Sequence, residues 1–389
     1  MKKVYISVIA FVLSVITVCM GVQISGVHAD TEFKGVTAKS YVIVDDSGKI
    51  LIGKDAHKKR EVASICKLMT TLITLEKIEL GDLSLEDKFM VSEYASDAEG
   101  SQAFLDSGKE YLVKDLLKSV IVASANDSAI VLAEGIGGNE KSFVKLMNEK
   151  AIKLGMINTR YSNSTGLPAL EQYSTAYDTA ILLDKVSEFD IYKDFAKIWI
   201  DELEHSSGRK TELVNTNRLV KYYDYCSSGK TGFTDEAGYC LSSVANKGNL
   251  ELTCVVLGCN SSANRFKESI ELYNYAFANY RNEQVVFKDN QIENDVKVIG
   301  GKIDNVQLKP QEDFYLTTRV GNDVEYEIAY QLPKEIKASI QTGDVVGEMY
   351  VIVNGEIIKT INVVSVIDIE KQNFSDILDK ILNNFNVLK

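Results

Sequence analysis

The chain has few prolines, few histidines and no excess of basic residues. Its 389 residues include three prolines and three histidines, and 55 acidic residues outnumber 43 basic ones, for a net charge of −12. So few prolines exclude a proline-rich linker, and an acidic chain is a poor partner for nucleic-acid phosphates. The histidines, His28, His57 and His205, and the scattered cysteines lack the spacing of metal ligands. We therefore expect neither a metal site nor a nucleic-acid partner.

The rest of the composition is that of a folded protein. Apolar residues make up 45% of the chain and charged residues 25%, which excludes a disordered, collagen-like or multi-span membrane protein. A length of 389 residues suits two domains, or one large domain with an appendage.

Residues 1–29 have the features of a secretory signal peptide. Lys2 and Lys3 precede an uncharged apolar run from Val4 to about Val22, and Val27-His28-Ala29 supplies suitable residues before a cleavage site. An uncleaved anchor is the alternative, because the run approaches the length of a membrane span. Export would place the later cysteines in a setting that permits disulfides, but their odd number and spacing favour small core residues.

Residues 30–282 are predicted to form one mixed α/β domain. A hairpin pattern at Ser40–Leu51 is followed by helical periodicity between about Ser64 and Phe195. Strand patterns return at Lys230–Cys259, and a helix pattern at Ser269–Tyr280 ends the region. Strands, a large helical insert, and then strands with a helix are typical of a single α/β domain.

Residues 283–368 are predicted to form a small all-β domain, because short alternating runs dominate and Asn354-Gly355 is a strong hairpin signal.

Residues 369–389 form a predicted amphipathic helix. Its apolar stripe consists of Phe374, Ile377, Leu378, Ile381, Leu382, Phe385 and Leu388. Such a helix either docks on the β domain or lies on a membrane surface.

The pattern Ser-x-x-Lys suggests a hydrolase that uses lysine, not histidine, as its base. Residues three apart on a helix share a face, so the amine reaches the hydroxyl. The chain contains the pattern at Ser64/Lys67, Ser142/Lys145, Ser207/Lys210 and Ser227/Lys230. Ser64 alone opens a long apolar helix, where free N–H groups favour a developing negative charge. A helix N-cap is the plain alternative for this serine.

Two further motifs favour a catalytic Ser64. Ser124-Ala125-Asn126 lies where two helical stretches meet, and Lys230-Thr231-Gly232 begins a β run. A lysine and a threonine hold a carboxylate well, and a glycine on the strand permits close approach of a substrate backbone. In this order the three motifs match the S-x-x-K, S-x-N and K-T-G set of penicillin-interacting serine enzymes.

The flanking sequence resembles the D-alanyl-D-alanine carboxypeptidases, which are low-molecular-mass penicillin-binding proteins. Segments that carry the resemblance include ASICKLMTTL, GSQAFLDSG, YSNSTGLPALEQYSTAYDTAIL and SSGKTGFTDEAGYCL, and the match runs from about Ala38 to Ala278. The resemblance implies a β-lactamase/transpeptidase-like α/β domain, an antiparallel sheet with a large helical insert. It also implies a small β domain and a C-terminal helix that binds the outer face of the cytoplasmic membrane.

The implied reaction removes the terminal D-alanine from peptidoglycan stem peptides ending in D-Ala-D-Ala, without metal or cofactor and with β-lactams as covalent inhibitors. By resemblance Ser64 is the nucleophile and Lys67 its base. Ser124 relays a proton to the leaving group, and Asn126 binds the peptide and orients Lys67.

The remaining implied roles concern substrate binding. Lys230 and Thr231 receive the terminal carboxylate beside Gly232, and Arg265 supports that recognition. The backbone N–H groups of Ser64 and Phe233 form the oxyanion hole.

The sequence departs from the family at Cys66, where threonine is usual, and at Gln172, where a histidine is frequent. Neither change removes a required chemical group. A class A β-lactamase is disfavoured because no Glu-x-x-Leu-Asn motif lies between the second and third motifs. A D,D-endopeptidase or a non-catalytic wall sensor with the same fold remains an alternative.

Overall fold

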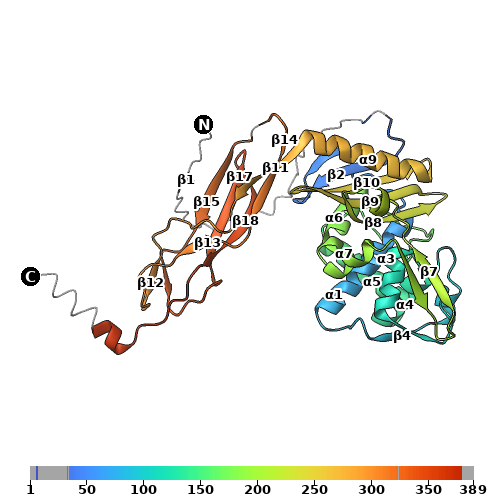
Figure 1. Ribbon diagram of the computed structural model, residues 1–389, viewed down its shortest axis with the longest axis horizontal. Coiled ribbons are helices and arrows are strands. Elements are labelled where there is room, and N and C mark those ends of the chain that lie inside the picture. The colour runs from blue at the N-terminus through green and yellow to red at the C-terminus, as the bar shows by residue number, and fades with distance from the viewer. Residues whose placement is uncertain (1–5, 8–32, 34, 323, 379–389) are drawn as a thin grey trace, which may run out of the picture. The chain divides into compact units, whose positions relative to one another are not determined.

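The computed structural model describes residues 6–7, 33, 35–322 and 324–378. The chain divides into two compact units, Ile24–Asn279 and Tyr280–Lys389, the second of which includes Met1–Gln23 (Figure 1). The predicted signal peptide lies outside the described residues except for Ile6–Ser7, and the end of the predicted tail helix also lies outside them.

The first unit is built on a five-stranded antiparallel sheet of order β3-β2-β10-β9-β8. The hairpin predicted near residue 45 is confirmed as β2 (Ser40–Asp45) and β3 (Ile50–Lys54). The later strand region is confirmed as β8 (Cys226–Thr234), β9 (Gly238–Lys247) and β10 (Leu250–Cys259). This topology leaves β8 with a single strand neighbour, at the edge of the described sheet.

Helices cover both faces of this sheet (Figure 1). On one face α9 (Ser262–Asn279) places the Tyr273 hydroxyl 3.0 Å from that of Ser243 in β9. On the other face lies the helical insert, whose main helices are α1 (Lys67–Glu79), α3 (Val113–Val122), α4 (Asn126–Gly137), α5 (Glu140–Lys153), α6 (Ala176–Ser187) and α7 (Asp190–Ala196). Shorter elements are α2 (Glu93–Ser96), α8 (Leu219–Tyr222), β4 (Lys88–Met90), β5 (Glu110–Leu112), β6 (Ile200–Glu204) and β7 (Lys210–Val214).

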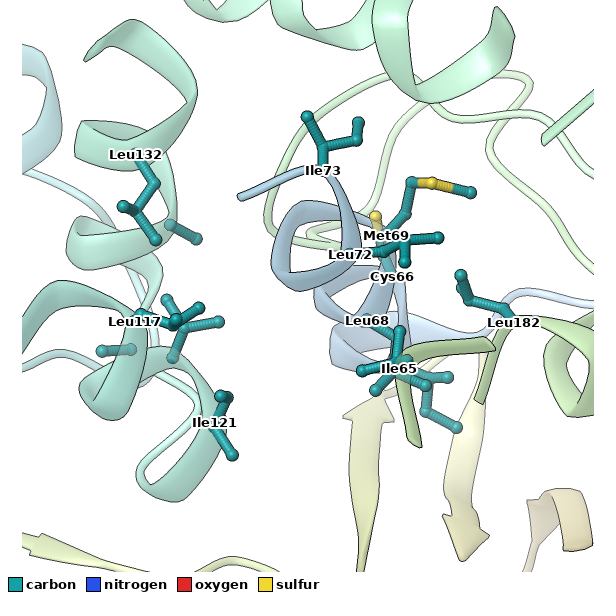
Figure 2. Close-up of a cluster of buried hydrophobic side chains, with 14 of the residues drawn as sticks. Ile65, Cys66, Leu68, Met69, Leu72, Ile73, Leu117, Ile121, Leu132 and Leu182 are labelled. Carbon is teal, nitrogen blue, oxygen red and sulfur yellow. The ribbon is translucent and has the colours of Figure 1, made fainter. Parts of the chain in front are cut away.

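The core of the first unit surrounds α1, whose first nine residues are all buried. Figure 2 shows Leu68 and Leu72 of this helix in a cluster that also includes Leu117, Leu132 and Leu182 from α3, α4 and α6. Each such leucine contributes about 2 kcal/mol through burial. A helix packed on all sides cannot shift, so the residues at its start are held in place.

The second unit is all β, as predicted. Its main sheet has the order β1-β15-β17-β18-β13, and β17 (Val345–Val353) and β18 (Glu356–Ser365) are joined at Asn354-Gly355. Both turn residues have positive φ, which matches the expected hairpin signal. The other strands are β1 (Ile6–Ser7), β11 (Tyr280–Val286), β12 (Lys297–Ile299), β13 (Leu308–Pro310), β14 (Phe314–Arg319), β15 (Tyr326–Gln331) and β16 (Glu335–Lys337).

The chain turns helical again at residues 374–378. Asn373 and Asp376 cap this turn reciprocally, each side chain accepting a hydrogen bond from the other's backbone N–H. Phe374 is 80% exposed, and Ile377 and Leu378 are also exposed. In the part of the chain that the structure describes, no helix has the length and hydropathy needed to cross a bilayer.

Candidate active site

Ser64 and Lys67 lie together where the chain enters α1. Ser64 belongs to a short 3-10 helix (Ala63–Cys66) instead of the first α-helical turn, and Lys67 is the first residue of α1. The Lys67 Nζ donates a hydrogen bond of 2.9 Å to the Ser64 Oγ, and the lysine side chain is fully buried. The Ser64 side chain caps no helix in this arrangement, so the N-cap alternative is not supported.

Two glycines hold this turn against its neighbours. Ala63 has a φ of +49°, and Gly166, at +84°, lies so close that a Cβ there would meet the Ala63 carbonyl oxygen at 2.0 Å. A Cβ on Gly232 would approach the Val62 carbonyl oxygen to 2.5 Å. The protein's own chain thus fills the space that a side chain at Gly232 would need, while the expected approach of a substrate backbone to this strand stays a prediction. Gly232 therefore allows β8 to lie against the turn that carries Ser64.

A second serine and lysine pair is formed by Ser124, between α3 and α4, and Lys230 on β8. The Lys230 Nζ donates a 2.6 Å hydrogen bond to the Ser124 Oγ, and Ser124 has a φ of +62°. Backbone conformations of this kind concentrate at functional sites. Asn126 begins α4 and is fixed to the loop before it, because its backbone N–H donates to the Ser101 carbonyl and its Nδ2 to the Glu99 carbonyl. The Asn126 Oδ1 is buried without a hydrogen-bond partner among the described residues, so it is available to a ligand.

Both lysines are more acidic than exposed lysines. Burial lowers the pKa of Lys67 to about 7, although the charge of Asp127 opposes the change. Burial, with the positive charges of Lys67 and Arg265, also lowers the pKa of Lys230 well below its usual value. An amine with a pKa near neutrality is partly unprotonated at the working pH and can accept the proton of a serine hydroxyl. The arrangement can therefore serve chemically as a serine nucleophile with a lysine base.

The second partner of Lys67 was missed by sequence reasoning. Its Nζ donates a 2.7 Å hydrogen bond to the Thr165 carbonyl, whereas the Asn126 side chain donates to the loop before α4. The Asn163 side chain holds the Thr165 carbonyl in place by accepting hydrogen bonds from the N–H groups of Thr165 and Gly166. Asn163 followed by Gly166 is a turn signal, and this pattern was the only sequence feature that indicated an ordered loop here.

Two more side chains support the same loop from outside. Glu140 accepts hydrogen bonds from both the N–H and the hydroxyl of Ser164. Gln172 accepts from the N–H of Asn163 at 3.1 Å and donates to the Leu167 carbonyl at 2.9 Å. Gln172, a departure from the family sequence, is thus a structural support of the loop that binds Lys67.

The end of the site near Arg265 is cationic. Arg265 donates from Nη1 to the Gly232 carbonyl at 3.1 Å, and its buried Nε has no partner among the described residues. Its guanidinium also lies over the ring of Tyr239, which stacks on Phe233 with 4.3 Å between the ring centres. Thr231 is buried on the same strand as Gly232. The structure thus places Arg265 next to the strand that carries Lys230 and Thr231.

Cys66 is a packed thiol. It is buried, its Sγ lies 3.4 Å from the Asn163 carbonyl oxygen, and burial raises its pKa to about 12. A thiol of such high pKa is a weak nucleophile. The other described cysteines are also free: Cys240, Cys254 and Cys259 are buried, as expected of core residues, whereas Cys226 is only partly buried. Among the described residues, no group of three His, Cys, Asp or Glu side chains is placed to hold a metal ion.

In the other three Ser-x-x-Lys patterns the serine and the lysine have other surroundings. Lys145 is exposed, and Lys210 pairs with Glu202 at 2.8 Å. Ser227 donates to the Val244 carbonyl, while Lys230 reaches Ser124 instead. The structure therefore brings all the predicted site residues to one region and selects Ser64 with Lys67 from the four candidate pairs.

Comparisons with known proteins agree with this geometry. The model of the D-alanyl-D-alanine carboxypeptidase family, peptidase S11, matches residues 27–261, and that of the penicillin-binding protein 5 C-terminal domain matches residues 280–371. The D-alanyl-D-alanine carboxypeptidase DacF of Bacillus subtilis (strain 168) is 36% identical over 356 residues, which cover 90% of this chain and 91% of the relative.

Solved structures show the same fold over both units. PBP3 of Streptococcus pneumoniae, a peptidoglycan synthesis regulatory factor, has a TM-score of 0.73 at 27% identity, covering 86% of this chain and 100% of that one. Penicillin-binding protein 5 of Haemophilus influenzae has a TM-score of 0.69 at 28% identity, covering 86% and 98%. The chain therefore belongs to the D-alanyl-D-alanine carboxypeptidase family, whose members are serine peptidases of the cell wall.

Proposed function

We propose that this carboxypeptidase cleaves the terminal D-alanine from peptidoglycan stem peptides through an acyl-enzyme on Ser64. The 2.9 Å hydrogen bond from Lys67 to Ser64, within a site that lowers the lysine pKa to about 7, is the observation that carries the proposal. Neutral Lys67 accepts the hydroxyl proton while the Ser64 Oγ bonds to the carbonyl carbon of the penultimate D-alanine.

The other site residues have roles that follow from their positions. The N–H groups of Ser64 and Phe233 stabilise the oxyanion, and the carboxylate of the substrate binds Lys230 and Thr231. Ser124, which is hydrogen-bonded to Lys230 at 2.6 Å, relays the proton that Lys67 took from Ser64 to the departing D-alanine amine as the peptide bond breaks, and this leaves Lys67 neutral again. Water then attacks the ester, with Lys67 again as the base, and releases the shortened peptide and free Ser64.

Penicillin labelling tests the nucleophile. Incubation with benzylpenicillin should add the mass of one penicillin to the intact protein, and the label should map to the peptide that contains Ser64. Ser64→Ala should stay unlabelled, whereas Ser142→Ala, from an unused Ser-x-x-Lys pattern, should be labelled like the wild type. A label on another serine would contradict the assignment.

The two alternatives give different products. An endopeptidase would cleave cross-linked stem peptides faster than it releases D-alanine from linear ones. A wall sensor would be acylated by penicillin and would release no D-alanine. The hydrogen-bonded nucleophile, base and proton relay argue against a sensor, and the match to the carboxypeptidase family favours the carboxypeptidase over the endopeptidase.

We also propose that the protein is exported and acts at the outer face of the cytoplasmic membrane. Residues 1–29 supply the signal, 30–282 the peptidase domain, 283–368 the β domain and 369–389 the membrane-associating helix. The exposed Phe374, Ile377 and Leu378 support this assignment, because an apolar stripe in water gains free energy on entering a lipid surface. Liposome flotation of the mature chain, against a variant truncated after residue 371, should show binding that the truncation abolishes.

A further inference from the structure

A cavity of about 440 Å³ lies beside the segment that leads to Ser64, and none of the residues assigned to the reaction above lines it. Its walls come from the segment just before Ser64, from a loop at residues 169–173, and from Glu236 and Ala237 just after β8. The volume is within the range of small-molecule and side-chain sites. The cavity is lined by charged groups of both signs.

Some of these charged groups already have partners within the protein. Lys59 lies 4.4 Å from the centre of the Tyr173 ring, and Arg60 donates hydrogen bonds to Ser40 and to the Lys39 carbonyl. Glu171 forms an ion pair of 2.9 Å with Arg160. These side chains fix the shape of the cavity.

Three other lining residues remain uncommitted. Lys39, Glu61 and Glu236 are exposed, and none forms an ion pair with another residue in the described ranges. Two carboxylates and one ammonium therefore face solvent around a preformed hollow. This combination suits a ligand side chain that carries an ammonium group, with or without a neighbouring carboxylate.

The direction of the substrate leads toward this cavity. β8 lies at the edge of the described sheet, so a peptide can pair along it as an additional strand. With its carboxylate at Lys230 and its scissile carbonyl at the Phe233 N–H, an antiparallel peptide runs toward Thr234 in the direction of its own N-terminus. The residue that precedes D-Ala-D-Ala then lies beside Glu236 and Ala237.

We infer that this cavity is a specificity site for the stem-peptide residue before D-Ala-D-Ala, and that Glu61 and Glu236 bind the ammonium of its side chain. The inference rests on the function proposed above. Lysine and a diamino diacid such as diaminopimelate both supply this ammonium. The diamino diacid would also present a carboxylate to Lys39.

Matched peptides test the inference. Nα-acetyl-L-lysyl-D-alanyl-D-alanine carries the side-chain ammonium, and its Nα,Nε-diacetyl counterpart does not. We expect the wild type to hydrolyse the first with about tenfold higher kcat/KM, mostly through KM, as one partly exposed charge-assisted contact would give. The double variant Glu61→Gln/Glu236→Gln should lose the preference and keep its kcat for the diacetyl peptide.

A control and a third peptide sharpen the result. Glu171→Gln removes an acid from the same cavity whose charge is already paired, so it should keep the preference. Lys39→Met should weaken hydrolysis of the diaminopimelate peptide and leave the lysine peptide unchanged if the carboxylate contact forms. Equal kcat/KM for both lysine peptides in the wild type, or a preference that survives the double variant, would overturn the inference.

Failure of the proposed reaction would look different, because neither peptide would then release D-alanine. Calorimetric titration of Ser64→Ala with both peptides decides the binding question in that case. Tighter binding of the ammonium peptide supports the specificity site, and equal binding rejects it.

Discussion

The two units of the protein differ in what they bury. The peptidase unit buries Lys67 and Lys230 completely or nearly so, together with Asp127 and Asn126. Among the described residues of the β unit, the buried polar side chains are hydroxyls, on Thr317, Thr318 and Ser365. Burying an amine costs free energy that ordinary packing does not. A fold accepts that cost where the perturbed group has a chemical task, so the comparison identifies the working unit.

The largest expected effect is on catalysis within the peptidase unit. Lys67→Ala removes the base, and the rate of acylation by a chromogenic β-lactam should fall by roughly 10²–10⁴-fold. Lys145→Ala, from an exposed Ser-x-x-Lys pattern, should leave the rate unchanged. The thermal transition of Lys67→Ala should not fall, because the substitution removes a buried amine. Normal acylation of Lys67→Ala would contradict the assignment of Lys67 as the base.

In the β unit the corresponding effect is on stability alone. Ile361 is 1% exposed in its core, and Ile361→Ala should lower the free energy of unfolding of that unit by about 2–5 kcal/mol. Denaturant titration should show this unit unfolding earlier, while the acylation rate in buffer stays the same. Leu117→Ala is the matched change in the core of the peptidase unit, and it should lower the stability of the peptidase unit instead. If Ile361→Ala reduced acylation by tenfold, the chemistry would depend on both units.

A third effect concerns a partly buried acid outside the active site. Asp184 on α6 accepts a hydrogen bond from Thr253, and burial raises its pKa to about 7. Because the folded protein holds this proton more tightly than the unfolded chain, the wild type loses stability as the pH rises from about 4 to about 7. Asp184→Asn should therefore gain about 2 kcal/mol over the wild type between pH 4 and 8, a value that allows for partial contact with water.

Denaturant titrations of both proteins across this pH range measure the gain. Asp190→Asn, an exposed acid that begins the next helix, is the control and should follow the wild type. Parallel stability curves for wild type and Asp184→Asn would show that the acid is not perturbed.

The smallest effect is the pH dependence of acylation itself. Because burial lowers the pKa of Lys67 to about 7, the neutral base increases from a few per cent at pH 5.5 to most of the molecules at pH 8. The acylation rate should rise roughly 30-fold over that interval and then level off. Stopped-flow measurements with a β-lactam that does not titrate in this range provide the profile. A flat profile would mean that Lys67 is not the base.

The proposed catalytic groups could be picked out from the sequence because each is a side chain in a spaced motif. Ser64, Lys67, Ser124 and Lys230 fall into two hydrogen-bonded pairs as a result. The Thr165 carbonyl could not be predicted, since a backbone acceptor has no residue-specific signature and tertiary approach decides which lysine it meets.

Element positions show the same limit. The helix expected from Ser269 begins at Ser262. The prediction placed its start too late because the first turns are polar and lack the apolar stripe from which a helix is predicted. By contrast, the Asn354-Gly355 hairpin was predicted correctly, since both residues adopt the positive φ that this turn requires. Motifs and turns that depend on neighbouring residues can be predicted from the sequence, whereas contacts between distant segments cannot.

Release of D-alanine from a stem pentapeptide ending in D-Ala-D-Ala tests the central claim most directly. The wild type should release D-alanine continuously, and Ser64→Ala, folded by its thermal transition, should release none. Continued release by Ser64→Ala would contradict the nucleophile, and no release by a folded wild type would contradict the carboxypeptidase reaction itself.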